Sequence, residues 1–378
     1  MAARAAIGVV RRRHRGIPWR GLLAPRASGS IGLGMPMRLA AAAAVVSAMV
    51  PLVAAGAPSV RQLLATYFHF DRHQIDEVER RKAVSVSLPG SLDREILAAG
   101  AVRIGAPARR VLNLFRDIET LESGTGFLTT VQLSDPPRLD DFDALVLPPS
   151  DIADLRRCTP GDCELKLNQR GFDLLAQVDW RRPDADAQAQ RFARQMLLSI
   201  ALAYRTRGNA GLGLSMDDEP HRQIAGEFGE MLRGKPFLEH ATPGLAQYML
   251  GYPSAAGPPQ LEEFLYWSLV EFGLKKTVRL NHVLMYPVAG AVPSRWVLAN
   301  RIVYASHYFQ NGVEVRLLVD DPADPAAAHY LFVLNMARPD GLTGVFGPLV
   351  RYKVRSGSRE TLRKTMLITR DRAEAAAR

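Results

Sequence analysis

Two polar residues, His282 and Asn300, stand among apolar neighbours where the chain alternates as β-strands do. Alternation over 277–286 places His282 on one strand face with Leu280, Leu284 and Tyr286. Over 296–309 the same rule groups Asn300 with Trp296, Leu298, Ile302 and Tyr304. A polar side chain in such surroundings needs a hydrogen-bond partner when it is buried. Each residue is therefore either a satisfied core residue or a polar contact for a ligand in an apolar cavity.

The aromatic residues of the same region would supply the walls of such a cavity. Tyr266, Trp267 and Tyr304 combine large apolar rings with polar tips. Alternation alone does not decide which face of the sheet is concave. An enzyme would need converging acid–base groups instead, and His282 and His307 are the visible candidates for that role.

Motifs for catalysis, metal binding or cofactor binding are missing from the sequence. It contains no Gly-x-Ser-x-Gly, Ser-x-x-Lys, His-Glu-x-x-His or Gly-x-x-x-x-Gly-Lys-Ser/Thr motif. The glycines of 208–213 follow a helical pattern and lack the dinucleotide-binding spacing. Two acidic or histidine-containing segments are better explained as solvated surface, namely His69, Asp71 and His73, and Asp140, Asp141 and Asp143. The sequence predicts neither a metal site nor a cofactor.

Cys158 and Cys163 are the two cysteines of the chain, and they flank a turn. Pro160 and Gly161 suit the central positions of a type II turn, which would bring the two Cβ atoms within bridging range. The spacing differs from the Cys-x-x-Cys of thiol oxidoreductases, and no histidine lies nearby to complete a zinc site. In an oxidising compartment the pair is expected to form a disulfide that closes a small loop.

Charge is unevenly distributed along the 378 residues. The net charge of +10 arises mainly from residues 1–57, which contain eight arginines and no acidic residue. Removing those eight from the 48 basic residues leaves 40, against 38 acidic residues. A nearly neutral body lacks the broad basic surface of a nucleic-acid-binding protein, so no nucleic-acid partner is expected.

The segment 35–55 is typical of a secretory signal peptide. Met37-Arg38 precedes an uncharged apolar stretch that ends in small residues, with cleavage expected after Ala55. We interpret residues 1–34 as an annotation overrun or a basic leader. An uncleaved anchor, twin-arginine export and an organellar transit peptide remain alternatives. The expected location is periplasmic or secreted.

Periodicity predicts the elements that must position the polar residues. Helical patterns occur at 59–82, from Ala106-Pro107 to about 121, throughout 169–251 and at 359–377. A hairpin is predicted over 83–104, and short strands at 127–134, 144–147 and 163–167. The last third alternates through five strands that short turns connect, at 262–272, 277–286, 296–309, 313–320 and 329–337. Tight turns between strands imply an antiparallel meander.

This order of elements resembles the START-like (SRPBCC, helix-grip) superfamily. The resemblance rests on 100–117 at one end, and on 296–304 with the helix after 341–346 at the other. It covers about two thirds of the mature chain, with 169–251 as a helical insertion. The cysteine loop and Phe264-Leu265-Tyr266-Trp267 also look like an uncharacterised group of exported bacterial proteins. The resemblance implies an α+β domain over 56–378, in which a curved antiparallel sheet grips a long C-terminal helix.

That superfamily includes lipid carriers, cyclases and protein-binding modules, so several functions are implied. We expect an exported protein that binds or carries a lipid or another apolar small molecule, with transient membrane contact. Leu362 and Met366 of the C-terminal helix should close over the sheet. The predicted ligand-binding residues are Tyr266, Trp267, His282, Trp296, Asn300, Tyr304 and Met366. Alternatives are a cyclase or hydrolase-type enzyme using the same cavity, and an envelope protein whose inserted helices bind a partner.

Overall fold

The alternating apolar segments of the last third form long strands in the structure, a computed structural model that describes residues 58–90, 94–124, 126–271, 275–340 and 347–375. All of these belong to the unit Ala55–Arg378. The predicted leader and signal peptide lie outside the described residues.

Eight strands form one antiparallel sheet in the order β1-β2-β10-β9-β8-β7-β6-β3. The predicted hairpin is β1 (Val84–Leu88) with β2 (Ile96–Ile104), and β3 (Phe127–Gln132) pairs with β6 at the opposite end of this order. The predicted meander comprises β6 (Glu262–Glu271), β7 (Lys276–Pro287), β8 (Arg295–Ala305), β9 (Phe309–Asp320) and β10 (His329–Pro339). The α+β class and the antiparallel meander are confirmed.

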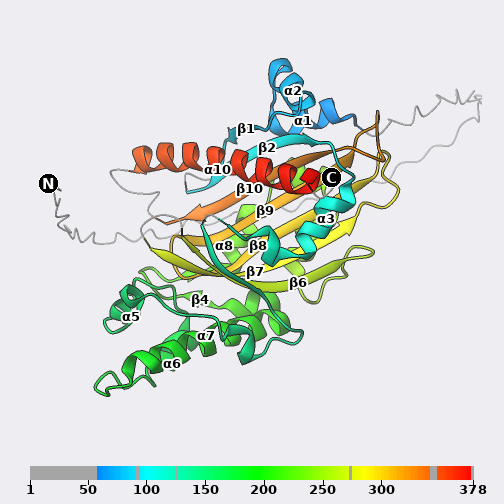
Figure 1. The fold of residues 1–378 in the computed structure, drawn as a ribbon. Helices are drawn as coiled ribbons and strands as arrows, with labels where there is room; N and C mark the ends of the chain where they lie inside the picture. The colour runs from blue at the N-terminus through cyan, green and yellow to red at the C-terminus, as the bar shows by residue number, and fades with distance from the viewer. Residues whose placement is uncertain (1–57, 91–93, 125, 272–274, 341–346, 376–378) are drawn as a thin grey trace, which may run out of the picture. The chain divides into compact units, whose positions relative to one another are not determined.

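Three helices pack on one side of the sheet, which we call the α10 face. The long C-terminal helix α10 (Gly347–Ala375) crosses it, as Figure 1 shows in red, while α3 (Ala108–Arg116) and α4 (Ile118–Leu121) connect β2 to β3. Leu362 and Met366 of α10 are buried here, as predicted. Sheet residues on this face include Tyr266, Val283, Leu298, Leu318 and Val333.

A long helical segment between β3 and β6 packs on the other side, which we call the insertion face. Its main helix α7 buries Phe192, Met196, Ile200 and Tyr204 at the predicted helical spacing. Helices precede the predicted start at 169, so the helical segment is longer than expected. Its elements are η1 (Leu139–Phe142), α5 (Pro149–Leu155), α6 (Gln169–Leu175), α7 (Ala185–Arg207), η2 (Gly208–Leu212), β4 (Leu214–Ser215), β5 (Arg222–Gln223), α8 (Ile224–Leu232), η3 (Phe237–Ala241) and α9 (Leu245–Gly251).

Two short helices begin the described chain, α1 (Val60–Phe68) and α2 (Arg72–Glu79). Each starts with a capping box, in which Ser59 pairs with Gln62 and Asp71 pairs with Gln74. Phe68 packs against the ring of Phe332 in β10, with centroids 5.9 Å apart, so α1 extends the core of the insertion face.

Three local predictions were wrong. Segments 144–147 and 163–167 are not strands. Their backbone groups make single hydrogen bonds rather than a ladder with a neighbouring strand, and Lys166 N, for example, donates to Ser306 O. The C-terminal helix begins at Gly347 rather than 359. The helix continues through Gly357, since a glycine costs a helix only about 1 kcal/mol relative to alanine.

Met366 should be a sensitive position, because its side chain fills the space above Gly100. A Cβ atom built on Gly100 would lie 2.6 Å from Met366 Cε. We expect Met366→Trp to overpack this contact and lower the free energy of unfolding by about 1–3 kcal/mol in urea denaturation. Ile368→Trp is the matched control on the same helix, because Ile368 is 49% exposed. Equal stability of the two variants would contradict this packing.

Candidate functional site

Polar side chains gather on the α10 face at the middle of the sheet, where cores are usually apolar. Tyr266 of β6 lies opposite Asn281 of β7, and Asn281 lies opposite Ile302 of β8. Asn300 of β8 lies opposite Glu314 of β9. Neighbours on one sheet face are close enough for their side chains to interact. We call this group the polar row: Glu122, Tyr266, Asn281, Asn300, Glu314 and Arg316.

A directed chain of hydrogen bonds begins at Glu122, which follows α4. The Glu122 carboxylate accepts from Tyr266 OH at 2.7 Å and from Arg279 Nη2 at 3.1 Å. Burial, reinforced by the charge of Glu122, raises the pKa of Tyr266 well above its ordinary value, so the hydroxyl keeps its proton. Since Tyr266 OH donates to Glu122, it accepts from Asn300 Nδ2 at 2.6 Å.

The side chain of Asn281 differs from its neighbours because it makes no hydrogen bond with the described residues. It is 0% exposed, and neither Nδ2 nor Oδ1 is bonded among the described residues. Asn300 Oδ1 is likewise buried without a partner. A buried unpartnered amide costs about 1–3 kcal/mol, so such groups call for an explanation.

The polar row lies where the helices cover the sheet incompletely. Central-strand residues on this face keep partial solvent contact, namely Asn300, Ile302, Glu314, Asn335 and Ala337. Within 351–361 of α10 every side chain is exposed or half-buried, whereas Leu362 is buried. Residues 351–361 of α10 therefore leave part of the sheet accessible beside the polar row.

Arg316 ends the polar row next to α3. Its guanidinium stacks on the ring of Phe115, with Cζ 4.2 Å from the centroid, and Nη2 pairs with Glu314. Nε and Nη1 have no partner among the described residues. The charge of Arg316 is thus neutralised while two of its donor atoms remain free.

The seven predicted ligand-binding residues divide between the two faces. Tyr266, Trp296 and Met366 belong to the core of the α10 face, and Asn300 is hydrogen-bonded to Tyr266 there. Trp267 and Tyr304 pack in the core of the insertion face, and His282 bonds to α7. These residues therefore do not line one common cavity.

Tyr304 was assigned to the wrong face. A β-bulge shifts the β7–β8 register, so that Leu280 pairs with Tyr304 while Asn281 pairs with Ile302. The extra residue returns Tyr304 to the insertion face, where its hydroxyl donates to Lys166 O at 3.1 Å. Simple alternation cannot reveal such a bulge. Beside Tyr304 the remaining cavity is about 10 Å³, too small for a ligand.

His282 is a satisfied core residue on the insertion face. Its Nδ1 lies 2.9 Å from Tyr204 OH, and its Nε2 lies 3.1 Å from Glu263 Oε2. Arg301 Nη1 donates to Tyr204 OH, and Tyr248 OH donates to Glu263. Both ring nitrogens are engaged inside the protein, so the geometry leaves His282 no nitrogen for a substrate.

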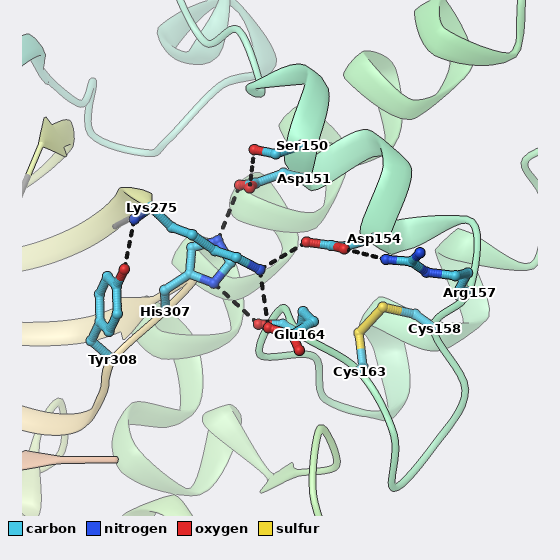
Figure 2. Close-up of polar contacts among 10 residues, drawn as sticks. All are labelled: Ser150, Asp151, Asp154, Arg157, Cys158, Cys163, Glu164, Lys275, His307 and Tyr308. Carbon is cyan, nitrogen blue, oxygen red and sulfur yellow. Dashed lines mark hydrogen bonds and ion pairs between the residues drawn. A yellow bond between two sulfur atoms is a disulfide. The ribbon is translucent and has the colours of Figure 1, made fainter. Parts of the chain in front are cut away.

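His307 is engaged in the same way at the turn before β9. Figure 2 shows its ring between α5 and the cysteine loop, with Nε2 3.1 Å from Asp151 Oδ2 and Nδ1 3.1 Å from Glu164 O. Lys275 Nζ joins the same region by donating to Asp154 and Glu164. These contacts hold the cysteine loop against the sheet and leave neither ring nitrogen of His307 free.

The predicted Cys158–Cys163 disulfide is present in this loop. It is consistent with an extracellular or periplasmic location, because such bonds persist in oxidising compartments. The predicted signal peptide lies outside the described residues.

An open cleft of about 400 Å³ lies between the α8 start and the end of β10, with His221 among its lining residues. Arg94 and Arg338 line it, but Arg94 pairs with Glu227 and Glu230, and Arg338 also pairs with Glu230. The charges of these two arginines are therefore compensated by neighbouring glutamates.

Sequence reasoning missed four residues of the polar row: Glu122, Asn281, Glu314 and Arg316. Glu122 is distant in sequence and approaches Tyr266 only through the α3–α4 connection. Asn281 stands next to His282, and alternation would have placed it with Tyr266 once β6 and β7 were paired. An asparagine inside an apolar strand was the available signal.

Comparison with known proteins adds no family. No protein-family model matches the sequence, and no curated protein matches it significantly. Among the described residues, no group of three or more His, Cys, Asp or Glu is placed to hold a metal ion. In the same parts of the chain, no helix is both long and apolar enough to cross a bilayer.

The disulfide should contribute measurably to stability. Cross-linking a loop of this size restricts the unfolded chain by about 2 kcal/mol in the chain-entropy account. We expect the double variant Cys158→Ser, Cys163→Ser to lose about this much in urea denaturation. Two thiols titrating in denaturant without a reductant would contradict the bond in the native protein.

His282 should make the protein less stable in mild acid. Burial lowers its pKa, although Glu263 acts in the opposite direction. The unfolded chain therefore binds a proton below about pH 6.5 that the folded protein does not, and stability falls by at most about 1.4 kcal/mol per pH unit. We expect His282→Gln to reduce this slope between pH 6.5 and 5.5 in urea denaturation. His73→Gln, at a side chain 77% exposed, is the control, and equal slopes would contradict the assignment.

Proposed function

We propose that this is an exported START-like protein that binds a hydrophobic ligand with a polar end between α10 and the sheet. The order of elements supports the START-like assignment: β2, the helices α3 and α4, β3, the β6–β10 meander and then α10 across the sheet. The disulfide supports export. The helical insertion covers the opposite face, so the α10 face is the side left for a ligand.

The observation that carries this proposal is Asn281. A fully buried carboxamide without a hydrogen-bond partner lowers the stability of the protein. Its presence is explained if it binds a ligand. Ligand sites are mostly apolar and contain a few polar groups that orient the ligand. Asn281 lies beside Tyr266 and Ile302 in register, with half-buried Ala337 nearby across Gly312, and this combination fits such a site.

The two histidines support binding rather than catalysis. An acid–base enzyme needs a group within hydrogen-bond reach of its substrate. His282 and His307 each use both ring nitrogens inside the protein, and neither lies in the polar row. Binding or carriage therefore requires fewer assumptions about this chain than a cyclase or hydrolase activity does.

Replacing Asn281 should separate stability from binding. We expect Asn281→Leu to raise the free energy of unfolding of the ligand-free protein by about 1–3 kcal/mol, because it removes an unpartnered buried amide. The same change should lower co-purification of lipid in native mass spectrometry, and weaken binding of the neutral probe Nile red. Lower stability with unchanged binding would contradict the proposal.

A large side chain placed in the solvent-accessible part of the α10 face tests the location of the ligand site independently. Ala337 is half-buried on the α10 face, and its register partner on β9 is Gly312, which has no side chain. We expect Ala337→Trp to abolish Nile red binding while the melting temperature changes little. Leu202→Trp on α7, where Leu202 is 38% exposed, is the control and should bind normally. Loss of binding in the control alone would place the ligand on the insertion side.

A further inference from the structure

The charges of the polar row are already balanced. Arg279 pairs with Glu122 at 3.1 Å, and Arg316 pairs with Glu314. Each guanidinium thus faces one carboxylate. A charged ligand end would leave an uncompensated charge in a largely buried region, which is strongly unfavourable. The charge balance favours a ligand whose polar end is neutral.

The direction of the hydrogen bonds decides which neutral groups fit. Glu122 accepts from Tyr266 OH, and Tyr266 OH accepts from Asn300 Nδ2. Because Asn300 Nδ2 donates to Tyr266, its Oδ1 is left as an unused acceptor. A ligand would have to donate a hydrogen bond to it. Arg316 Nε and Nη1 are unused donors that require an acceptor, and Asn281 has both an unused donor, Nδ2, and an unused acceptor, Oδ1. One ligand group must therefore both donate and accept.

We infer that, if the proposed function holds, the polar end of the ligand is an uncharged hydroxyl group that lies between Asn281 and Asn300. A hydroxyl supplies one donor and two acceptor lone pairs. A carboxylate only accepts, and it would face Asn300 Oδ1, Glu122 and Glu314. An ether or ester also only accepts, so it would leave Asn300 Oδ1 unpartnered. The chemical class is a long-chain or polycyclic alcohol.

Two isomeric probes isolate this hydroxyl. Decan-1-ol and 1-methoxynonane have the same composition, but only the alcohol can donate a hydrogen bond. We expect decan-1-ol to displace Nile red from the mature protein at a concentration about tenfold or more below that of 1-methoxynonane, since a site that lacks its donor leaves buried groups unpaired. Decanoate at neutral pH should also compete poorly.

Variants assign that preference to the asparagines. Asn300→Leu and Asn281→Leu should bring the two isomers close to equal potency, while residual binding is measured directly with radiolabelled decan-1-ol. Asn113→Leu, at an exposed position on α3, should retain the preference. The measured quantity is the ratio of the potencies of decan-1-ol and 1-methoxynonane within one variant. A general loss of stability would weaken both competitors and leave this ratio unchanged.

The outcomes separate the two proposals. If wild-type protein binds neither Nile red nor decan-1-ol, the proposed function itself fails. If it binds the probe but the alcohol, ether and decanoate compete equally, the function stands and the hydroxyl inference is overturned. Stronger competition by decanoate than by decan-1-ol would show that the site selects a carboxylate instead.

Discussion

The eight-stranded sheet has apolar side chains on both faces, and the need to cover both is the constraint on which the rest of the structure depends. On one side the helical insertion covers the sheet with closely packed aromatic and aliphatic residues. On the other side α3 and the second half of α10 cover part of the sheet, with Met366 in direct contact at Gly100. The remaining part of that face contains the polar row.

His282 and Asn281, neighbouring buried residues of β7 on opposite faces of the sheet, differ in their side-chain hydrogen bonding. On the insertion face His282 has a partner for each ring nitrogen, as expected of a polar residue that serves packing. On the α10 face, among the described residues, the Asn281 carboxamide has no partner and Asn300 uses only Nδ2 of its carboxamide. Because a satisfied network rigidifies a core and an unsatisfied one destabilises it, the second arrangement is the one that a ligand would complete.

The sequence was sufficient to predict the meander, because successive strands that are joined by tight turns pair as antiparallel neighbours. It also predicted the disulfide, from the Pro160-Gly161 turn between two cysteines. It failed at Tyr304, since a bulge adds one residue without any clear signature in composition. The predicted short strands at 144–147 and 163–167 were wrong because these segments join no strand ladder, and their leucines pack in the core beside α7 and the sheet.

The candidate site was harder to predict than the fold. Alternation sorts residues into two sets but does not say which set meets a helix, so the predicted residues came from both faces. Glu122 could not be placed from sequence, because the α3–α4 connection brings it to Tyr266 from 144 positions away. The sequence did contain one signal, an asparagine inside an apolar strand at 281 and again at 300. Asn300 was predicted from it and Asn281 was not.

Side-chain amide resonances provide the most direct test of a ligand site on the α10 face. They can be followed by NMR in the labelled mature protein as decan-1-ol is added. If the ligand completes the polar row, the carboxamide signals of Asn281 and Asn300 shift with saturation, and that of Asn209 on the insertion side does not. Saturable shifts at Asn209, with the Asn281 and Asn300 signals unchanged, would contradict the account.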